Sequence, residues 1–291
     1  MTTHPFLGTE ALAAGRVSRR ALRRYRSIHR DVYLAPDGVV TPTVRAQAAW
    51  LWSGRGAIAG GLSASALYGT KWIDPVAPAE LFRVNGKPVN GILIHRDVLQ
   101  DGEYQLFRGI PVTTPARTAF DLGRRKGPTL AVERIDALAN QTGVTASEVF
   151  TLIDRHPGVR GLVQLRTVIS QMDGGAESPQ ESRTRLVLVN SGLPRPRTQI
   201  RVHPYRVDMG YDEFKVGVEY DGEQHWKDPS QHARDIDRLA DLASLGWRII
   251  RVSAQILRYR PQVIVSRTCE ALRDGGAEWP VISRILDGRV S

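Results

Sequence analysis

Two carboxylates with the spacing of a β-strand lie in the segment 215–221, Lys-Val-Gly-Val-Glu-Tyr-Asp. Successive side chains of a strand alternate between its faces, so Glu219 and Asp221 project from one face, together with Lys215. The apolar residues of the opposite face are Val216, Val218 and Tyr220. Divalent cations such as Mg²⁺ bind carboxylate oxygens and water, and one or two protein carboxylates suffice. A bound cation activates water and neutralises phosphate charge, so the pattern suits hydrolysis of a phosphodiester.

A third carboxylate, Asp208, precedes Glu219 by eleven residues. We expect Asp208 at the end of a strand that spans 199–208. A tight turn at positions 211–212 would leave Asp208 about 13 Å from Glu219, too far for a shared cation. The hypothesis of a shared cation therefore requires a wider loop, centred near positions 213–214, that brings the two carboxylates side by side.

The candidate carboxylates also have structural interpretations. Glu181 ends the run Ser178-Pro-Gln-Glu, which has the form of a capping box at a helix start, and this spacing favours a cap over a fourth site residue. Asp208 and Asp221 each lie close before a glycine, as turn residues do. Glu219 has no comparable alternative, because a carboxylate between two apolar strand residues needs a partner.

The chain of 291 residues is basic, with a formal net charge of +10. This balance favours a polyanionic partner, above all nucleic acid. Its one cysteine, Cys269, excludes an internal disulfide framework and a cysteine-based zinc cluster. The N-terminal sequence lacks the pattern of a signal peptide, and no apolar run is long enough to span a bilayer. We therefore expect a cytoplasmic protein without a membrane partner.

Residues 1–40 predict a winged helix-turn-helix. A short helix from Thr9, a turn at Gly15 and a basic helix over 18–25 precede an extended segment that ends in the turn 36–38. The second helix of such a module enters the major groove of DNA. The candidate DNA-binding residues are Arg16, Arg19, Arg20, Arg23 and Arg24. The alternative is a charged face that is merely solvated.

The rest of the chain predicts two further parts and a mixed α/β fold class. Residues 41–172 predict a largely helical α+β middle domain, in which strands at 80–84 and 92–96 flank an Asn90-Gly91 turn. The run 172–175, Met-Asp-Gly-Gly, is the best candidate for a linker. Residues 177–291 predict an α/β domain with a central sheet. Its expected helices are 178–190, 229–245 and 267–273, and its expected strands are 199–208, 215–220 and 247–252.

The run 218–225, Val-Glu-Tyr-Asp-Gly-Glu-Gln-His, together with Arg234-Asp235 and Gly-Trp-Arg-Ile-Ile-Arg at 246–251, resembles a bacterial domain family. That family is related to the very-short-patch-repair (Vsr) endonuclease, and both belong to the PD-(D/E)XK class with a restriction-endonuclease-like α/β fold. The resemblance covers about 177–258. It implies an acidic cluster of Glu181, Asp208, Glu219 and Asp221, in which Asp208, Glu219 and Asp221 bind Mg²⁺ or Mn²⁺. It also implies that His225 is a general base or phosphate contact and that the Arg234-Asp235 pair is structural.

One departure from the class motif concerns catalysis. The class carries Glu-x-Lys, whereas this chain has Glu219-Tyr-Asp221, so the usual lysine is absent. Related families carry Asp or His at that position. Lys215 shares the strand face with Glu219, but four residues is far along a strand.

The N-terminal half is similar to antitoxins of the AbiEi type, in which a winged helix binds operator DNA. The similarity rests on the basic helices and on the runs 29–34, 62–69 and 112–122. The alternative for the last two runs is helices of the core. These observations predict a metal-dependent DNA endonuclease with an N-terminal DNA-binding module. Two alternatives remain open: a non-catalytic, antitoxin-like DNA-binding regulator with a degenerate nuclease fold, and RNA as the substrate. The sequence does not indicate the oligomeric state.

Overall fold

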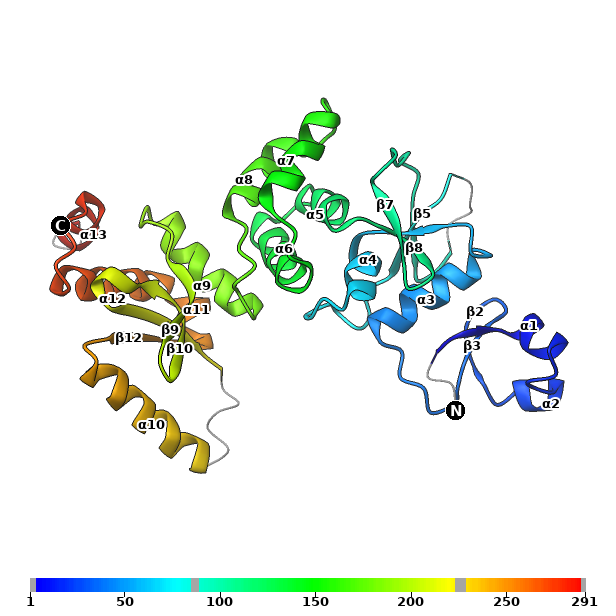
Figure 1. Ribbon diagram of the computed structural model, residues 1–291, viewed down its shortest axis with the longest axis horizontal. Helices are drawn as coiled ribbons and strands as arrows, with labels where there is room; N and C mark the ends of the chain where they lie inside the picture. Colours follow the sequence, from blue (N-terminus) through cyan, green and yellow to red (C-terminus); the bar gives the residue numbers. More distant parts are fainter. Residues whose placement is uncertain (1–3, 85–88, 223–228, 289–291) are drawn as a thin grey trace. The chain divides into compact units, whose positions relative to one another are not determined.

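The computed structural model describes residues 4–84, 89–222 and 229–288. The chain forms two compact units, Met1–Met172 and Asp173–Ser291, which are described separately. Three sheets lie among the helices, which confirms a mixed α/β fold (Figure 1). No helix within the described ranges is long and apolar enough to cross a membrane.

The first 40 residues form a small three-stranded sheet with two short helices. The elements are β1 Phe6–Leu7, α1 Gly8–Ala13, α2 Arg19–Leu22, β2 Arg26–His29 and β3 Val32–Leu34. The sheet is antiparallel in the order β1-β3-β2. Two helices precede an extended region as predicted, but the chain turns at Arg30-Asp31 within that region, so β2 and β3 form a hairpin there rather than one segment that ends at 36–38. Ser18 caps α2, because its Oγ accepts a hydrogen bond from the Ala21 amide at 3.2 Å. Helix α2 is shorter than the expected 18–25.

The small sheet has its core in common with the next helix, α3 Pro42–Trp52. Val32 of β3 is buried against Ala48 and Leu51 of α3. Helix α3 also contacts a strand of the second sheet, β5 Ala79–Phe82. The division of the first unit into parts 1–40 and 41–172 stays a prediction, since one helix packs against both sheets.

The second sheet of this unit has five strands in the order β6-β5-β4-β8-β7. Its remaining strands are β4 Ile58–Ala59, β6 Ile92–His95, β7 Tyr104–Phe107 and β8 Ile110–Thr113. Strands β5 and β6 flank the Asn90-Gly91 turn as predicted, yet they pair in parallel, so this turn does not close a simple hairpin. The hairpin of β7 and β8 was not predicted. The helices are α4 Gly61–Tyr68, α5 Pro115–Gly123, α6 Pro128–Thr142, α7 Ala146–Arg155 and α8 Leu162–Gln171.

The second unit is a four-stranded sheet with helices on both faces (Figure 1). The sheet order is β12-β11-β10-β9, with only β11 and β12 parallel. The strands are β9 Arg197–Val202, β10 Tyr205–Tyr211, β11 Val216–Asp221 and β12 Arg248–Ser253. The helices are α9 Pro179–Asn190, α10 Pro229–Ser244, α11 Ala254–Tyr259, α12 Pro261–Asp274 and α13 Pro280–Asp287, with a 3₁₀ turn η1 at Asp212–Phe214.

Two apolar cores lie on opposite faces of this sheet. Val216 and Val218 of β11 pack with Ile264 and Leu272 of α12 and with Leu188 of α9. On the other face, residues of β9, β10 and β12 surround Leu242 of α10. The predicted alternation of β11 is therefore confirmed, whereas the predicted strand 199–208 is wrong: it is divided between β9 and β10 by the turn at His203-Pro204.

Candidate functional site

The hairpin of β10 and β11 determines where the predicted carboxylates lie. Met209 pairs with Val218, and Tyr211 pairs with Val216, so the loop between the strands spans 212–215. This is the wider loop that a shared cation site requires. The Tyr220 amide donates a hydrogen bond of 3.0 Å to Asp208 Oδ2, which places the Asp208 carboxylate next to β11 beside Glu219.

Asp208 lies within β10 rather than at a strand end, at a break in the alternation of that strand. Val207 packs into the core beneath α10, whereas Met209 packs into the core beneath α9 and α12. In an ordinary strand these two residues would share a face. A related irregularity occurs in the neighbouring strand, where Gln199 adopts a left-handed φ of 54°. The break turns the Asp208 side chain toward the backbone of β11 instead of a regular sheet face.

Glu181 forms half of the predicted capping box and also lies near Asp208, while its part in the site stays a prediction. At the start of α9 its Oε1 accepts a bond from Ser178 Oγ at 2.8 Å, and its Oε2 accepts one from the Glu177 amide at 2.9 Å. Ser178 Oγ in turn accepts from the Glu181 amide. The same carboxylate lies near Gln199 Nε2, at 3.4 Å, and close enough to Asp208 to act on its charge. A helix cap is thus also a member of the acidic cluster.

Two neighbouring carboxylates raise the free energy of Asp208 in its charged state. Burial, followed by the charges of Glu181 and Glu219, raises the pKa of Asp208 to about 7. Burial also raises the pKa of Glu181, although its hydrogen bonds at the helix start oppose this shift. Like charges in a partly buried site disfavour ionisation, and a nearby cation removes that penalty. The charge of an ionised Asp208 is therefore not fully neutralised by its surroundings.

Two arginines neutralise the remaining acids of this face. Arg238 of α10 binds both oxygens of Glu219, at 2.8 and 2.7 Å, and also contacts Asp235 at 3.1 Å. Arg251 of β12 binds Asp221 at 2.6 Å and Asp235 at 3.0 Å. Asp221 shares the strand face of Glu219 but turns to Arg251, so its part in metal binding stays a prediction.

The number of carboxylates that lie side by side limits the kind of metal ion that these residues could hold. Among the residues that the structure describes, no three His, Cys, Asp or Glu side chains form a ready metal-binding group. A cage built only of protein ligands, as zinc uses, is therefore not what these residues offer. Asp208 is partly buried, has a raised pKa and lies beside Glu219. Mg²⁺ or Mn²⁺ fits, because such cations keep several waters and need only one or two carboxylates.

The remaining predicted residues have different outcomes. His225 lies outside the described residues. Lys215 was expected on the strand face of Glu219, which is wrong: it precedes β11 in a left-handed conformation, φ 52°, and its Nζ donates to the Leu245 carbonyl. Sequence reasoning also missed Arg238, Arg251 and Gln199. The spacing of Asp235 and Arg238 on one helix face was a usable signal, whereas Arg251 requires knowledge that β12 pairs with β11.

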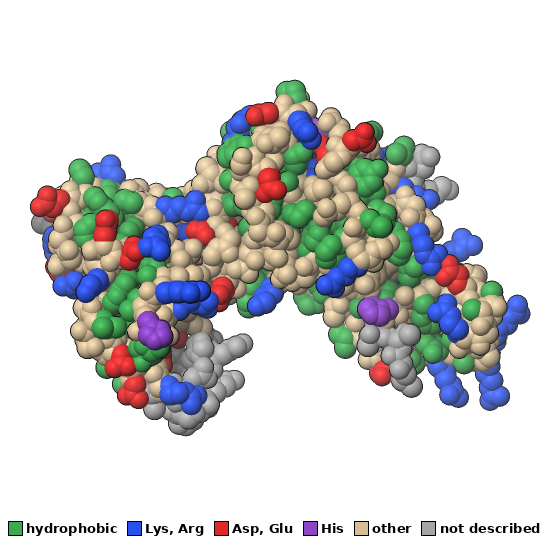
Figure 2. All heavy atoms as spheres, viewed as in Figure 1, with side chains coloured by type: hydrophobic (Ala, Val, Ile, Leu, Met, Phe, Trp, Pro, Cys, Tyr) green, Lys and Arg blue, Asp and Glu red, His purple; other side chains and the backbone are tan. Residues whose placement is uncertain are grey.

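The candidate DNA-binding arginines are all exposed. None of the five forms an ion pair with another residue in the described part of the chain. Figure 2 shows Lys and Arg side chains projecting where α1 and α2 lie. A group of exposed cations without acidic partners is suited to phosphate contacts.

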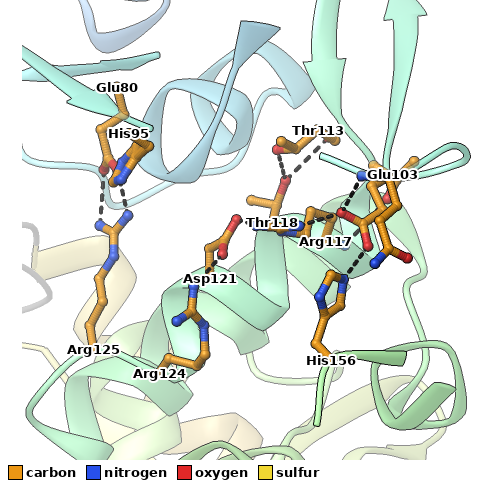
Figure 3. A network of polar contacts seen from close by, with 12 residues as sticks. Glu80, His95, Glu103, Thr113, Arg117, Thr118, Asp121, Arg124, Arg125 and His156 are labelled. Carbon is orange, nitrogen blue, oxygen red and sulfur yellow. Dashed lines mark hydrogen bonds and ion pairs between the residues drawn. The ribbon is translucent and has the colours of Figure 1, made fainter. Parts of the chain in front are cut away.

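A second buried polar cluster occupies the first unit, around α5 (Figure 3). Glu80 is bound by Arg125, by His95 at 2.8 Å and by the Leu62 amide at 3.0 Å. Glu103 is bound by Arg117 and His156. Every carboxylate of this network that Figure 3 labels faces a cation, so its charges are balanced and its role is to hold the fold together.

Comparison with known proteins gives a family match within the second unit. Residues 181–272 match the family model REase_MTES_1575, a restriction endonuclease-like family. Over a longer stretch, the chain is similar to two uncharacterized proteins of Mycobacterium tuberculosis, MT2308 of strain CDC 1551 / Oshkosh and Rv2248 of strain ATCC 25618 / H37Rv. Each is 31% identical over 216 residues, which cover 72% of this chain and 79% of the relative. The chain belongs to the family of these mycobacterial proteins. No solved structure matches it.

Proposed function

We propose that this protein is a Mg²⁺- or Mn²⁺-dependent endonuclease that cleaves DNA at the cluster of Glu181, Asp208 and Glu219. One observation carries the proposal: within a restriction endonuclease-like domain, Asp208 is held beside Glu219 and Glu181 with its pKa raised to about 7. Buried acids without enough positive charge are unfavourable for folding, and sites that bind cations accept this cost.

The chain's own residues have distinct tasks in this proposal. Asp208 and Glu219 hold the cation, and Glu181 adds negative charge while the start of α9 keeps it in place. Asp221 and His225 assist, the latter as general base or phosphate contact by resemblance. The cation, when bound, supplies an activated water and neutralises the phosphate. The exposed arginines Arg16, Arg19, Arg20, Arg23 and Arg24 bind the DNA backbone.

A cleavage assay with purified protein tests the catalytic assignment. Supercoiled DNA is incubated with Mg²⁺ or Mn²⁺ and with wild type, Asp208→Ala or Glu219→Ala. We expect both variants to lose at least about 100-fold in rate, because each removes a group that holds the activating ion. Glu270→Gln, an exposed carboxylate of α12, is the control and retains the wild-type rate. Equal cutting by all four proteins contradicts the proposal.

A second candidate is a DNA-binding regulator whose nuclease fold is inactive. The observation that favours it is the pairing of Glu219 with Arg238 and of Asp221 with Arg251, on a strand that also lacks the usual lysine. This candidate predicts tight DNA binding without cleavage and without cation affinity. A competition assay with duplex DNA and duplex RNA of one sequence identifies the preferred nucleic acid in either case.

A further inference from the structure

Arg238 of α10 binds Glu219, one of the carboxylates of the acidic cluster, through both of its terminal nitrogens. Its two terminal nitrogens donate to the two oxygens of Glu219 at 2.8 and 2.7 Å. Glu219 is only 7% exposed. A bidentate pair of guanidinium and carboxylate has a defined geometry and is stronger than a single ion contact.

A second carboxylate anchors Arg238 independently of Glu219. Asp235 lies three residues earlier on α10, and its Oδ1 accepts from Arg238 Nε at 3.2 Å and from Nη2 at 3.1 Å. Arg251 holds the other oxygen of Asp235 at 3.0 Å. The guanidinium of Arg238 would therefore keep one acidic partner, itself held in place, if it gave up Glu219.

A divalent cation and Arg238 compete for Glu219. The bidentate pair places a hydrogen bond on each carboxylate oxygen, so an ion shared by Asp208 and Glu219 approaches an oxygen that already has a donor and meets the positive charge of the guanidinium. Resting on the proposed function, we propose that Arg238 is a positioning residue that occupies Glu219 in the cation-free protein and yields it to the metal ion while staying bound to Asp235. The arginine thereby prevents Glu219 from being an unpaired buried charge before the ion arrives.

Calorimetric titration of the full chain with MnCl₂ at pH 8, without nucleic acid, tests this competition. Arg238→Gln removes the competing cation and is expected to bind Mn²⁺ about tenfold more tightly than wild type. Arg267→Gln is the matched control, because Arg267 is an exposed arginine of α12, on the opposite face of the sheet. This control loses the same charge and is expected to keep the wild-type affinity.

The outcomes separate this inference from the proposed function. If Arg238→Gln binds Mn²⁺ equally or more weakly while wild type binds it, the competition is overturned and the cation site stands. If neither protein binds Mn²⁺, both proposals are overturned. Arg238→Lys provides a second measurement should the glutamine variant not fold. Lysine keeps the charge but cannot pair with both oxygens of Glu219. The Mn²⁺ affinity of Arg238→Lys is therefore expected to lie between those of wild type and Arg238→Gln, and an affinity equal to that of wild type overturns the inference.

Thermal unfolding gives a readout that does not depend on binding heat. Without cation, Arg238→Gln is expected to melt below wild type, because Glu219 loses its partner. Saturating Mn²⁺ is expected to narrow this difference, since the ion replaces the arginine at Glu219. A difference in melting temperature that Mn²⁺ leaves unchanged would show that Arg238 and the ion do not share the carboxylate, and would overturn the inference.

Discussion

Both units of this protein bury carboxylates, yet they treat the charge in opposite ways. In the first unit, the partners of Glu80 overcome the cost of its burial and lower its pKa to about 2. In the second unit, burial and two neighbouring carboxylates raise the pKa of Asp208 to about 7. A carboxylate supplied with cations is stabilised in its charged form, whereas one close to other acids is destabilised in that form. In the proposed function, this difference distinguishes the cation site from the balanced network better than the mere presence of acidic residues.

The largest effect is expected from breaking the balanced network. Arg117 is 2% exposed and binds both Glu103 and Asp121. Replacement by Met leaves two buried carboxylates short of a cation, so we expect Arg117→Met to lower the free energy of unfolding by about 3–5 kcal/mol. Urea denaturation measures it, with Arg166→Met, an exposed arginine of the same unit, as control. A loss no larger than that of the control would remove the structural role assigned to this network.

The two units are expected to respond to acid in opposite directions. The pKa of Glu80 is lowered to about 2 in the folded protein, whereas a glutamate in the unfolded chain has a pKa of about 4.3. The contribution of Glu80 to the free energy of unfolding is therefore complete above about pH 4.3 and is lost as the pH falls toward 2. This amounts to about 3 kcal/mol. The pKa of Asp208 is raised to about 7, so its charged carboxylate lowers the free energy of unfolding by the full amount above that pH. This destabilising effect disappears as the pH falls toward about 4.

Scanning calorimetry of the full chain between pH 8 and pH 3 measures how the stability of each unit depends on pH. The unfolding transition that Arg117→Met shifts belongs to the first unit. We expect the second unit to gain the contribution of Asp208 from pH 8 to pH 5, and the first to lose the contribution of Glu80 only below about pH 4.5. Glu80→Gln is expected to remove the acid slope of the first unit. Parallel slopes in both units would contradict the comparison.

Removing a charge from the acidic cluster is expected to stabilise the protein. At pH 8, Asp208→Asn eliminates the penalty of a buried carboxylate near Glu181 and Glu219, while its amide oxygen still accepts the bond from Tyr220. We expect a gain on the order of 2–4 kcal/mol without cation, up to the full conversion of the pKa shift, measured by urea denaturation. Asp237→Asn, exposed on α10, is expected to change stability by less than about 0.5 kcal/mol. A variant less stable than wild type would mean that Asp208 is already neutralised within the chain.

The smallest effects are expected at the exposed arginines of the first unit. Arg19→Gln and Arg23→Gln each remove one phosphate contact in the proposed function. Each is expected to weaken duplex DNA binding by less than about tenfold and to reduce the slope of log affinity against log salt by about one. Fluorescence anisotropy at several salt concentrations measures both quantities, with Arg273→Gln of α12 as control. An unchanged slope would indicate that this surface is only solvated.

The sequence predicted the second unit well where one local rule decided the structure. Alternation located β11 and its two faces, and the capping run at Ser178 located the start of α9. The predicted helical character of residues 41–172 was also found, in α3 to α8. The parallel pairing of β5 and β6 could not be predicted, since a glycine turn between two strands indicates a hairpin and only the rest of the sheet decides otherwise.

The sequence predicted which residues form the candidate site, but not which of its carboxylates are neutralised by arginines. Spacing identified Glu219 and Asp208, and loop geometry gave the condition that brings them together. The break of alternation at Asp208 has no local signal, because it depends on how β9 and β10 pack against both cores. The arginines that pair with Glu219 and Asp221 come from α10 and β12, so tertiary structure alone shows which acids are neutralised.

Proton-coupled Mn²⁺ binding tests the central claim most directly. Because the pKa of Asp208 is about 7, binding is expected to strengthen from pH 6 to pH 8 and to release a proton at pH 6. Calorimetry of the full chain in two buffers with different ionisation enthalpies measures both. We predict one bound ion in wild type and at least about tenfold weaker binding in Asp208→Asn. Binding that ignores pH and is unaffected by Asp208→Asn would contradict a cation site at these carboxylates.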